Sequence, residues 1–485
     1  MSIIKNINAA LKKREISCAE LTDKYLGAIE ENADLNAFIT VTAEQAKAAA
    51  AATDKRIAGG EDISLLDGVP MSIKDNITTK GIETTCASKI LKGHVPIYDA
   101  FVWRCLKAEG AVLLGKTNLD EFGMGSGTEN SCFGPTLNPH NKAHVPGGSS
   151  GGAAAAVAAG LCAYGLGTDT GGSIRQPAAF CGIVGIKPTY GAVSRFGAIA
   201  YASSFDQIGV LAPSAEDASV VFNAMSGYDE ADSTCVQPGL RGGRQVDIND
   251  DVKGRKIAFI KECFDGLPEH IKSAVMAAVK DYEALGAEII EVSVPGMAYA
   301  LPVYYILACA EASSNLGRYD GIRYGHRTDS YLNINEMIMK TRTEGFGDEV
   351  KRRIMLGTYV LSSGYYDAYY KKAQNLRAEI TDEFKKIFDT ADVVLAPTAP
   401  STAMKIGDRD DDPVKAYLGD ILTVPVNVCG LPAINLPCGE DAKGLPIGMQ
   451  LIGDKFDESM LFNMAHVFET AYPQYTKRLH MGVEL

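Results

Sequence analysis

Two glycine-rich segments of this chain each contain a serine that could take part in acyl transfer. The first, Gly147–Gly152, reads GGSSGG and contains Ser149, and the second, Gly167–Ser173, reads GTDTGGS and ends on Ser173. Glycine lets backbone N–H groups converge on one point, because no side chain stands in the way. A hydroxyl beside such N–H donors combines a nucleophile with an oxyanion hole. The two segments therefore predict a hydrolytic site.

A Ser-His-Asp hydrolase does not fit these segments. Residues 147–151 match the pattern G-x-S-x-G, but that nucleophile elbow needs a hydrophobic strand directly before it. Here residues 138–146 read NPHNKAHVP, which predicts a loop. The histidines further along the chain lie in no recognisable motif: His270, His326, His466 and His480.

A match to the phosphate-binding loop is rejected as well. Residues 110–117 read GAVLLGKT and fit the pattern G-x4-G-K-T. A phosphate-binding loop follows a strand, whereas the interior of this match, AVLL, is itself an apolar strand. Its backbone amides are therefore expected to bond to neighbouring strands and not to a nucleotide.

The remaining base for a serine nucleophile is a lysine whose pKa is lowered by burial. Lys74 ends the apolar run 69–73, so its neighbours could keep water away from the amine. Asp75 follows it, but successive side chains of a strand face opposite sides, so Asp75 need not pair with Lys74. From its position alone, Lys74 could equally be a solvated charge at the edge of a sheet.

The composition narrows the class of protein. The chain has 485 residues, of which 46% are hydrophobic, and its net charge is −13. This charge argues against a nucleic-acid-binding surface over the whole molecule, although a partner could bind the nucleic acid. Eleven cysteines without a Cys-x-x-Cys pair indicate reduced thiols in a cytoplasmic protein, and the seven histidines show no metal-ligand spacing. No segment resembles a signal peptide or reaches about 18 apolar residues, so no membrane span is expected.

The alternation of expected strands and helices predicts an α/β fold around a mostly parallel or mixed sheet. Short apolar runs predict strands at residues 69–73, 111–114, 256–260, 288–292, 393–395 and 448–452. A capping box at Ser17 predicts a helix that starts there, and periodicity predicts further helices at residues 43–57, 153–161, 270–285, 379–388 and 458–472. We expect a single domain over residues 1–485 with a mainly helical insertion around 300–390, and a solvated loop at the acidic run 408–412.

Lys74, the GGSSGG segment and the GGS at 171–173 together resemble the amidase signature family. The resemblance implies an amidase-signature fold, in which a central mixed β-sheet is flanked by helices on both faces. It implies that Ser173 is the nucleophile, Ser149 a bridging serine that follows a cis peptide bond, and Lys74 the base. The backbone N–H groups that it places in the oxyanion hole are those of Thr170, Gly171, Gly172 and Ser173. Two neighbours of the nucleophile, Asp169 and Arg175, are expected to be structural hydrogen-bonding residues.

Three further segments, residues 120–131, 319–326 and 351–357, resemble the glutamine-hydrolysing subunits of tRNA-dependent amidotransferases, a branch of the same family. Such a subunit hydrolyses glutamine and sends the ammonia through a channel to a partner subunit, which converts Glu-tRNA(Gln) to Gln-tRNA(Gln) with ATP. A small third subunit completes a heterotrimer. The resemblance thus places ATP, Mg²⁺ and the main tRNA contacts on the partner, and no cofactor or metal on this chain.

A glutaminase must also recognise the α-carboxylate and the α-ammonium group of its substrate, which requires an arginine and a carboxylate in one pocket. By position in the motifs, the resemblance gives these roles to Arg353 and Asp420. Tyr304 matches the tyrosine of the pocket, although Tyr305 is adjacent. Without the resemblance, Arg353 and Asp420 could be members of ordinary ion pairs. Two other functions stay open: a freestanding amidase acting on another small amide, and a catalytically inactive scaffold.

Overall fold

The computed structural model describes residues 2–237, 246–249, 252–408, 417–476, 479 and 482–483. Residues 409–412 of the predicted acidic loop lie outside these residues. Short and mostly apolar runs form the strands of one sheet: β1 (Phe38–Val41), β2 (Pro70–Lys74), β3 (Val112–Thr117), β4 (Tyr164–Asp169), β5 (Val184–Lys187), β6 (Gln207–Ala212), β7 (Lys256–Ile260), β8 (Glu288–Val292), β9 (Val393–Pro397), β10 (Ala433–Glu440) and β11 (Pro446–Gly453).

The strand order in this eleven-stranded sheet is β1-β3-β2-β4-β6-β5-β10-β11-β9-β7-β8. Parallel pairs occur at β2–β3, β2–β4, β7–β8 and β7–β9, and the other neighbours are antiparallel. The sheet is therefore mixed, as the sequence predicted. Every residue of the central strands β2 to β6 is buried, which explains why these strands lack the alternation of a strand with one face in water.

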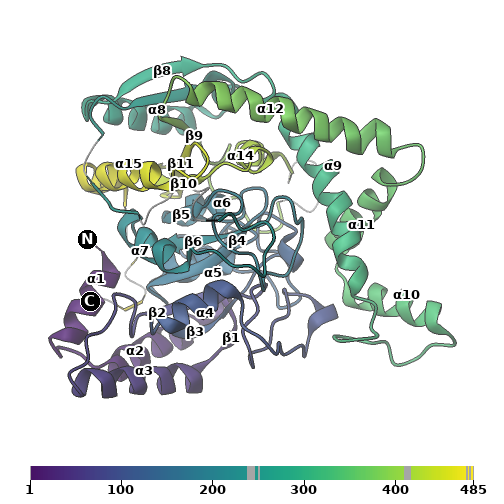
Figure 1. The fold of residues 1–485 in the computed structure, drawn as a ribbon, viewed down its shortest axis with the longest axis horizontal. Helices are drawn as coiled ribbons and strands as arrows, with labels where there is room; N and C mark the ends of the chain where they lie inside the picture. The colour runs from purple at the N-terminus through teal and green to yellow at the C-terminus, as the bar shows by residue number, and fades with distance from the viewer. Residues whose placement is uncertain are drawn as a thin grey trace.

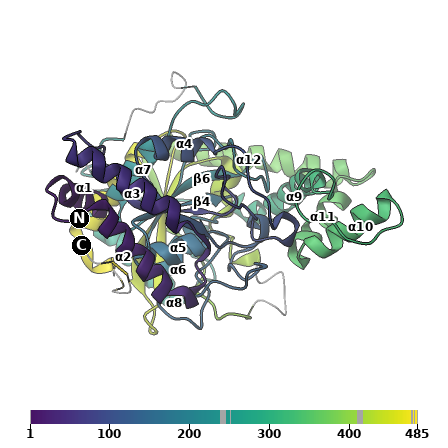
Figure 2. The same ribbon diagram turned by 90° about the horizontal axis from the view of Figure 1, so that it is seen from below.

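Helices cover both faces of the sheet (Figures 1 and 2). They are α1 (Ile3–Lys12), α2 (Cys18–Glu31), α3 (Ala43–Ala58), α4 (Phe101–Ala108), α5 (Gly151–Ala158), α6 (Arg175–Cys181), α7 (Ala215–Met225), α8 (Glu269–Ala284), α9 (Met297–Asn315), α10 (Ile334–Gly345), α11 (Asp348–Val360), α12 (Lys372–Phe388), α14 (Val424–Cys429) and α15 (Glu458–Ala471). Figure 2 separates α4 and α7, on one side of the strands, from α5, α6 and α8 on the other. The expected α/β class with helices on both faces is confirmed.

The chain between β8 and β9 is helical. It contains α9 to α12, which extend away from the sheet in both views (Figures 1 and 2). Helix α9 packs against α11, α12 and α14, so this extension is joined to the body of the molecule through α9 and α14.

Most of the elements with strong local signals lie where the sequence predicts them. Helix α2 begins after Ser17 with a complete capping box, and β7 and β8 match their predicted ranges. Strand β4 is not predicted, because glycines at 165 and 167 lower its strand propensity. Gly167 is needed there for a tertiary reason: a Cβ at this position would lie 2.9 Å from the hydroxyl oxygen of Ser150.

The topology brings three segments of interest to one edge of the sheet. Strands β2, β3 and β4 run parallel, so their carboxyl ends lie together. Lys74 is the last residue of β2, Asp120 follows β3, and the segment 170–173 follows β4. The carboxyl ends of parallel strands are the usual location of ligand sites in open α/β sheets.

Candidate active site

Lys74 is fully buried at the end of β2, and its amine is held by hydroxyl groups. Its Nζ lies 2.8 Å from Ser149 Oγ, 2.8 Å from Ser150 Oγ and 3.4 Å from the carbonyl oxygen of Thr168. Both serines directly precede α5, which packs on β2 and β4. Within the described part of the chain Lys74 forms no ion pair, so the solvated-charge interpretation is wrong.

The environment of Lys74 favours the neutral amine. Burial lowers the pKa of Lys74 from 10.5 to about 7, although the more distant carboxylates of Asp120, Asp169 and Asp206 oppose this shift. A buried cation without a close counter-ion loses its hydration and gains little Coulomb energy in return. A large fraction of Lys74 is therefore uncharged near neutral pH.

Asp75 pairs with a different lysine. Its carboxylate lies 3.1 Å from Nζ of Lys116, on β3, and accepts hydrogen bonds from the backbone and the hydroxyl of Thr85. Lys116 is fully buried and also donates to the carbonyl oxygen of Ile77. The sequence prediction that Asp75 leaves Lys74 free is thus confirmed. Because Lys116 is part of a sheet strand, GAVLLGKT forms no phosphate-binding loop.

Ser149 follows a cis peptide bond, as the resemblance implied. The N–H of Gly148 donates to Gln176 Oε1 at 2.9 Å, and the carbonyl oxygen of Ser149 accepts from the N–H of Asp120 at 3.3 Å. These two bonds attach the Gly148–Ser149 peptide to α6 on one side and to the segment after β3 on the other.

Ser173 lies next to this pair of serines. Its carbonyl oxygen accepts from the N–H of Ser150 at 3.1 Å, and the residue is 7% exposed, against 1% for Ser149. In the described residues its hydroxyl makes no hydrogen bond to another residue, and the bond from Ser173 to Ser149 that a proton relay would use is not formed.

The N–H groups of the loop after β4 differ in their availability. That of Gly172 donates to Asp169 Oδ1 at 2.8 Å, so it is not free to bind an oxyanion; this corrects the expectation for Gly172. The N–H groups of Thr170, Gly171 and Ser173 make no hydrogen bond to any described residue. Three of the four expected donors are therefore available.

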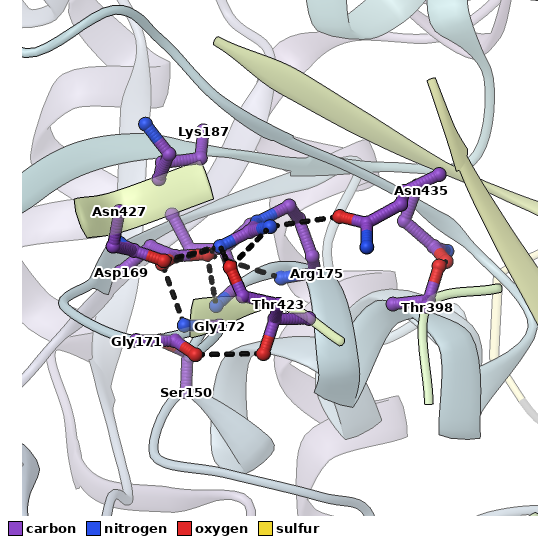
Figure 3. Close-up of polar contacts among 12 residues, drawn as sticks. Ser150, Asp169, Gly171, Gly172, Arg175, Lys187, Thr398, Thr423, Asn427 and Asn435 are labelled. Carbon is purple, nitrogen blue, oxygen red and sulfur yellow. Dashed lines mark hydrogen bonds and ion pairs between the residues drawn. The ribbon is translucent and has the colours of Figure 1, made fainter. Parts of the chain in front are cut away.

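Asp169 and Arg175 organise this loop (Figure 3). Arg175 Nε lies 3.1 Å from Asp169 Oδ2, and the guanidinium also donates to the carbonyl oxygen of Thr423. Asn427 donates to Asp169 Oδ1 at 2.8 Å. Burial alone would raise the pKa of Asp169, but Arg175 and these hydrogen bonds hold it at about 2. Both residues have the structural character that the sequence predicted.

Arg353 lies on α11 and is only 3% exposed. Its Nε donates to Glu349 Oε1 at 2.8 Å, and its Nη1 donates to the hydroxyl of Tyr201 at 2.7 Å. The guanidinium also faces three aromatic rings, with 5.3 Å to the centre of the Tyr305 ring. Among the described residues its Nη2 has no hydrogen-bond partner, which leaves one donor for a ligand.

Asp420 meets Arg353 through Tyr305. The Asp420 carboxylate accepts from the hydroxyl of Tyr305 at 3.0 Å and from Ser126 Oγ at 2.9 Å. Tyr304 faces the nucleophile loop instead: a Cβ on Gly171 would lie 2.7 Å from the Tyr304 hydroxyl. The structure thus brings both adjacent tyrosines to the site, one beside each part of it.

Several residues of the site had no sequence signal strong enough to find them. Ser150 is adjacent to Ser149 in GGSSGG, and this was the one available hint. Ser126 and Gln176 reach the site through contacts between distant segments; Gln176 donates to the carbonyl oxygen of Ser126 and accepts from Gly148. Such contacts leave no local pattern.

The largest hollow near the described surface lies elsewhere, between α2, α3 and β1, with a volume of about 580 Å³, and it contains none of these residues. Over the described ranges, no cluster of three or more His, Cys, Asp or Glu side chains has the geometry to hold a metal ion. All eleven cysteines are free. No helix in the described parts is long and apolar enough to cross a membrane.

Comparison with known proteins decides the family. Residues 20–462 match the model of the family described as Amidase. The chain belongs to the amidase family. It is therefore an enzyme that acts on amides, and its sheet and flanking helices are those of the amidase fold.

The relatives indicate the branch of the family. The chain is 52% identical to the A-type subunit of the glutamyl-tRNA(Gln) amidotransferase of Thermosynechococcus vestitus, over 99% of both chains. It is 40% identical to the crystal structure of the subunit of the same name from Thermotoga maritima, with a TM-score of 0.77 and coverage of 94% and 95%. A bacterial aryl acylamidase of the amidase signature family is 25% identical, with a TM-score of 0.84 and coverage of 98% and 97%.

Proposed function

We propose that this chain is the glutaminase subunit of a tRNA-dependent amidotransferase. It hydrolyses glutamine to glutamate and ammonia with Ser173 as nucleophile, Ser149 as bridging serine and Lys74 as base. The observation that carries the proposal is the buried amine of Lys74, with no counter-ion in contact among the described residues and 2.8 Å from Ser149 Oγ. Only an uncharged amine can accept a proton, and this environment favours that form.

The hydrogen bonds of Ser150 support this role because they orient the amine. The Ser150 hydroxyl donates to the carbonyl oxygen of Thr168 at 3.0 Å, so it can only accept from Lys74. A neutral amine that donates to Ser150 can direct its lone pair at Ser149 Oγ. Lys74 then takes the proton of Ser149, while Ser149 takes the proton of Ser173.

The reaction then follows from the groups around Ser173. Its Oγ attacks the side-chain carbonyl carbon of glutamine, and the N–H groups of Thr170, Gly171 and Ser173 stabilise the oxyanion. Lys74 returns the proton through the serines to the departing ammonia, which leaves a glutamyl ester on Ser173. Water hydrolyses this ester by the same relay. The hydrogen bond between Ser173 and Ser149 forms when substrate is bound, since catalytic hydrogen bonds are often long in the free enzyme.

Arg353 and Asp420 select glutamine among amides. The Nη2 of Arg353 binds the α-carboxylate, and the Asp420 carboxylate binds the α-ammonium group. Tyr305 holds both, through its ring and its hydroxyl, and Tyr304 packs on the nucleophile loop next to the substrate.

The ammonia passes to a partner subunit, which binds ATP, Mg²⁺ and the tRNA and converts Glu-tRNA(Gln) to Gln-tRNA(Gln); a small third subunit completes the complex. The relatives that are about 52% identical over nearly the whole chain carry the name of such a subunit, and this supports the assembly. The net charge of −13 fits a subunit that leaves the tRNA to its partner.

The test is Ser173→Ala in the complex with its partner subunits. We expect amidation of Glu-tRNA(Gln) with glutamine to fall by roughly a thousandfold or more, and amidation with added ammonia to stay near the wild-type rate. Covalent labelling of wild-type Ser173, but not of the variant, by a glutamine-like electrophile is the matching chemical check. Loss of both activities together would contradict the division of labour between the subunits.

A freestanding amidase is the second candidate, because solved amidases superpose on this chain with TM-scores up to 0.84. Such an enzyme would hydrolyse small amides rapidly without partners. Glutaminase activity that is weak in the isolated chain and rises with the partners would reject this candidate.

A further inference from the structure

Glu121 is a buried carboxylate with no basic partner in contact among the described residues. It lies in the short 3-10 turn Glu121–Gly123 after β3 and is 5% exposed. One oxygen accepts from the hydroxyl of Ser88, and Oε2 accepts from the backbone N–H of Gly347 at 2.8 Å. Burial raises the pKa of Glu121 to about 7. A buried carboxylate is expensive to maintain, so its two bonds call for an explanation.

The bond to Gly347 reaches the helix that carries Arg353. Gly347 is the N-cap residue of α11, and Glu349, in the first turn of that helix, orients Arg353 through the 2.8 Å ion pair. Gly347 and Glu121 touch so closely that a Cβ on Gly347 would lie 2.5 Å from Glu121 Oε2. The Ser88 hydroxyl extends the contact, because its oxygen also lies 3.2 Å from the carbonyl oxygen of Gly345 at the end of α10.

The residue before Glu121 fixes the other side of the substrate pocket. The carboxylate of Asp120 accepts from the backbone N–H groups of Thr128, Glu129 and Asn130, so it shapes the loop that carries Ser126. Ser126 in turn donates to Asp420. The N–H of Asp120 donates to the carbonyl oxygen of Ser149. Asp120 and Glu121 therefore connect the serine relay to both charged groups of the glutamine pocket.

We infer that Glu121 is a positioning residue for glutamine: by anchoring the start of α11 to the catalytic core, it sets the place of Arg353 and hence recognition of the α-carboxylate. This inference rests on the proposed function, which gives Arg353 that role. Glu121 touches neither substrate nor reacting atoms, so its effect passes through Gly347 and α11.

The surroundings predict what a loss of this anchor would do. A hollow of about 330 Å³ borders Glu121, Gly347 and Glu349, so water and not packed side chains would replace the missing carboxylate. The start of α11 would then loosen while β2, β4 and the serines keep their contacts. The reactive groups would stay in place, and the arginine would lose its fixed position.

The experiment compares two substrates in the full complex: glutamine, and 4-aminobutanamide, which keeps the amide and the amine but lacks the α-carboxylate. Glu121→Ala should raise KM for glutamine about tenfold, with kcat within about twofold, and leave kcat/KM for 4-aminobutanamide unchanged. Gly347→Ala tests the contact from the other side: its φ of −73° suits alanine, so only the clash with Glu121 acts. It should also raise KM for glutamine alone.

Two controls complete the design. Glu121→Gln can donate to Ser88 and accept from Gly347, and should stay within about threefold of wild type. Glu262→Ala removes a matched glutamate, which accepts from the hydroxyl of Ser293 and the N–H of Val294 beyond β7, and should change the kinetics of neither substrate.

Equal losses on both substrates in Glu121→Ala, or an unchanged KM for glutamine, would overturn the inference. Arg353→Ala separates this result from a failure of the proposed function. If Arg353→Ala raises KM for glutamine and Glu121→Ala does not, only the role of Glu121 is wrong. If Arg353→Ala leaves KM unchanged, the assignment of Arg353 itself fails, and the inference fails with it.

Discussion

Lys74 and Lys116 are two fully buried lysines at the ends of neighbouring parallel strands, yet their surroundings differ in one respect. Lys116 has the carboxylate of Asp75 at 3.1 Å, whereas Lys74 has the hydroxyls of Ser149 and Ser150. Burial lowers the pKa of both lysines, and for Lys116 the attraction of Asp75 opposes the shift. A counter-ion stabilises the ammonium form; without one, the same burial produces a base.

The comparison also shows how the fold keeps the two lysines apart in function. Register pairs Ile73 with Lys116 and Lys74 with Thr117, so the two lysines are offset by one position and Asp75 faces Lys116. A single change of alternation along β2 would give the counter-ion to Lys74 and remove its basicity. The pairing between β2 and β3 therefore helps to determine which lysine can act as a base.

The largest effect is expected for Lys74→Met, which removes the base and leaves no buried charge. Glutamine hydrolysis should fall by roughly a thousandfold or more, while the free energy of unfolding changes by less than about 1 kcal/mol. Steady-state kinetics and urea denaturation measure the two quantities. A stable variant that keeps its activity would show that Lys74 is no more than a second structural lysine.

Lys116→Met should have the opposite balance. It leaves Asp75 buried without its cation, which typically costs about 3–5 kcal/mol of stability. Adding Asp75→Asn should restore much of this loss, since the amide oxygen can still accept from the backbone of Thr85. Chemical denaturation of the two single variants and the double variant gives the coupling energy, and a coupling near zero would contradict the ion pair.

The pH dependence should separate the two lysines more finely. Because the pKa of Lys74 is about 7 and the neutral form is the base, kcat/KM for glutamine should rise about tenfold per pH unit below pH 7 and level off above it. Between pH 7 and 10.5 the unfolded lysine binds more protons than the folded one, so stability should rise with pH by at most about 1.4 kcal/mol per unit. This rise should be absent in Lys74→Met. Profiles that coincide for both proteins would place the titration on another group.

The fold could be predicted in its class and in its locally encoded elements. The capping box of α2 and the apolar runs of β7 and β8 are complete within a few residues, so no distant contact is needed to specify them. Strand β4 could not be predicted, for the opposite reason. Its glycines are unfavourable locally and are explained only by the approach of Ser150, which belongs to another segment.

The candidate site divides in the same way. Ser149, Ser173 and Lys74 could be selected from residue type, glycine context and family resemblance, and the structure brings them to one edge of the sheet. The prediction for the Gly172 N–H is wrong, because the sequence does not reveal that Asp169 already accepts from it. Tyr305 and Tyr304 could not be told apart, since adjacent residues on α9 differ only in what packs against them.

By itself the sequence determined which chemical groups the protein possesses and which short segments form strands and helices, because both depend on residues close together in the chain. Only the tertiary structure decided which buried lysine lacks a counter-ion, which N–H groups stay free, and how Glu121 reaches the helix of Arg353. These properties depend on contacts between segments far apart in the sequence, where burial and distance, and not residue type, set the electrostatics.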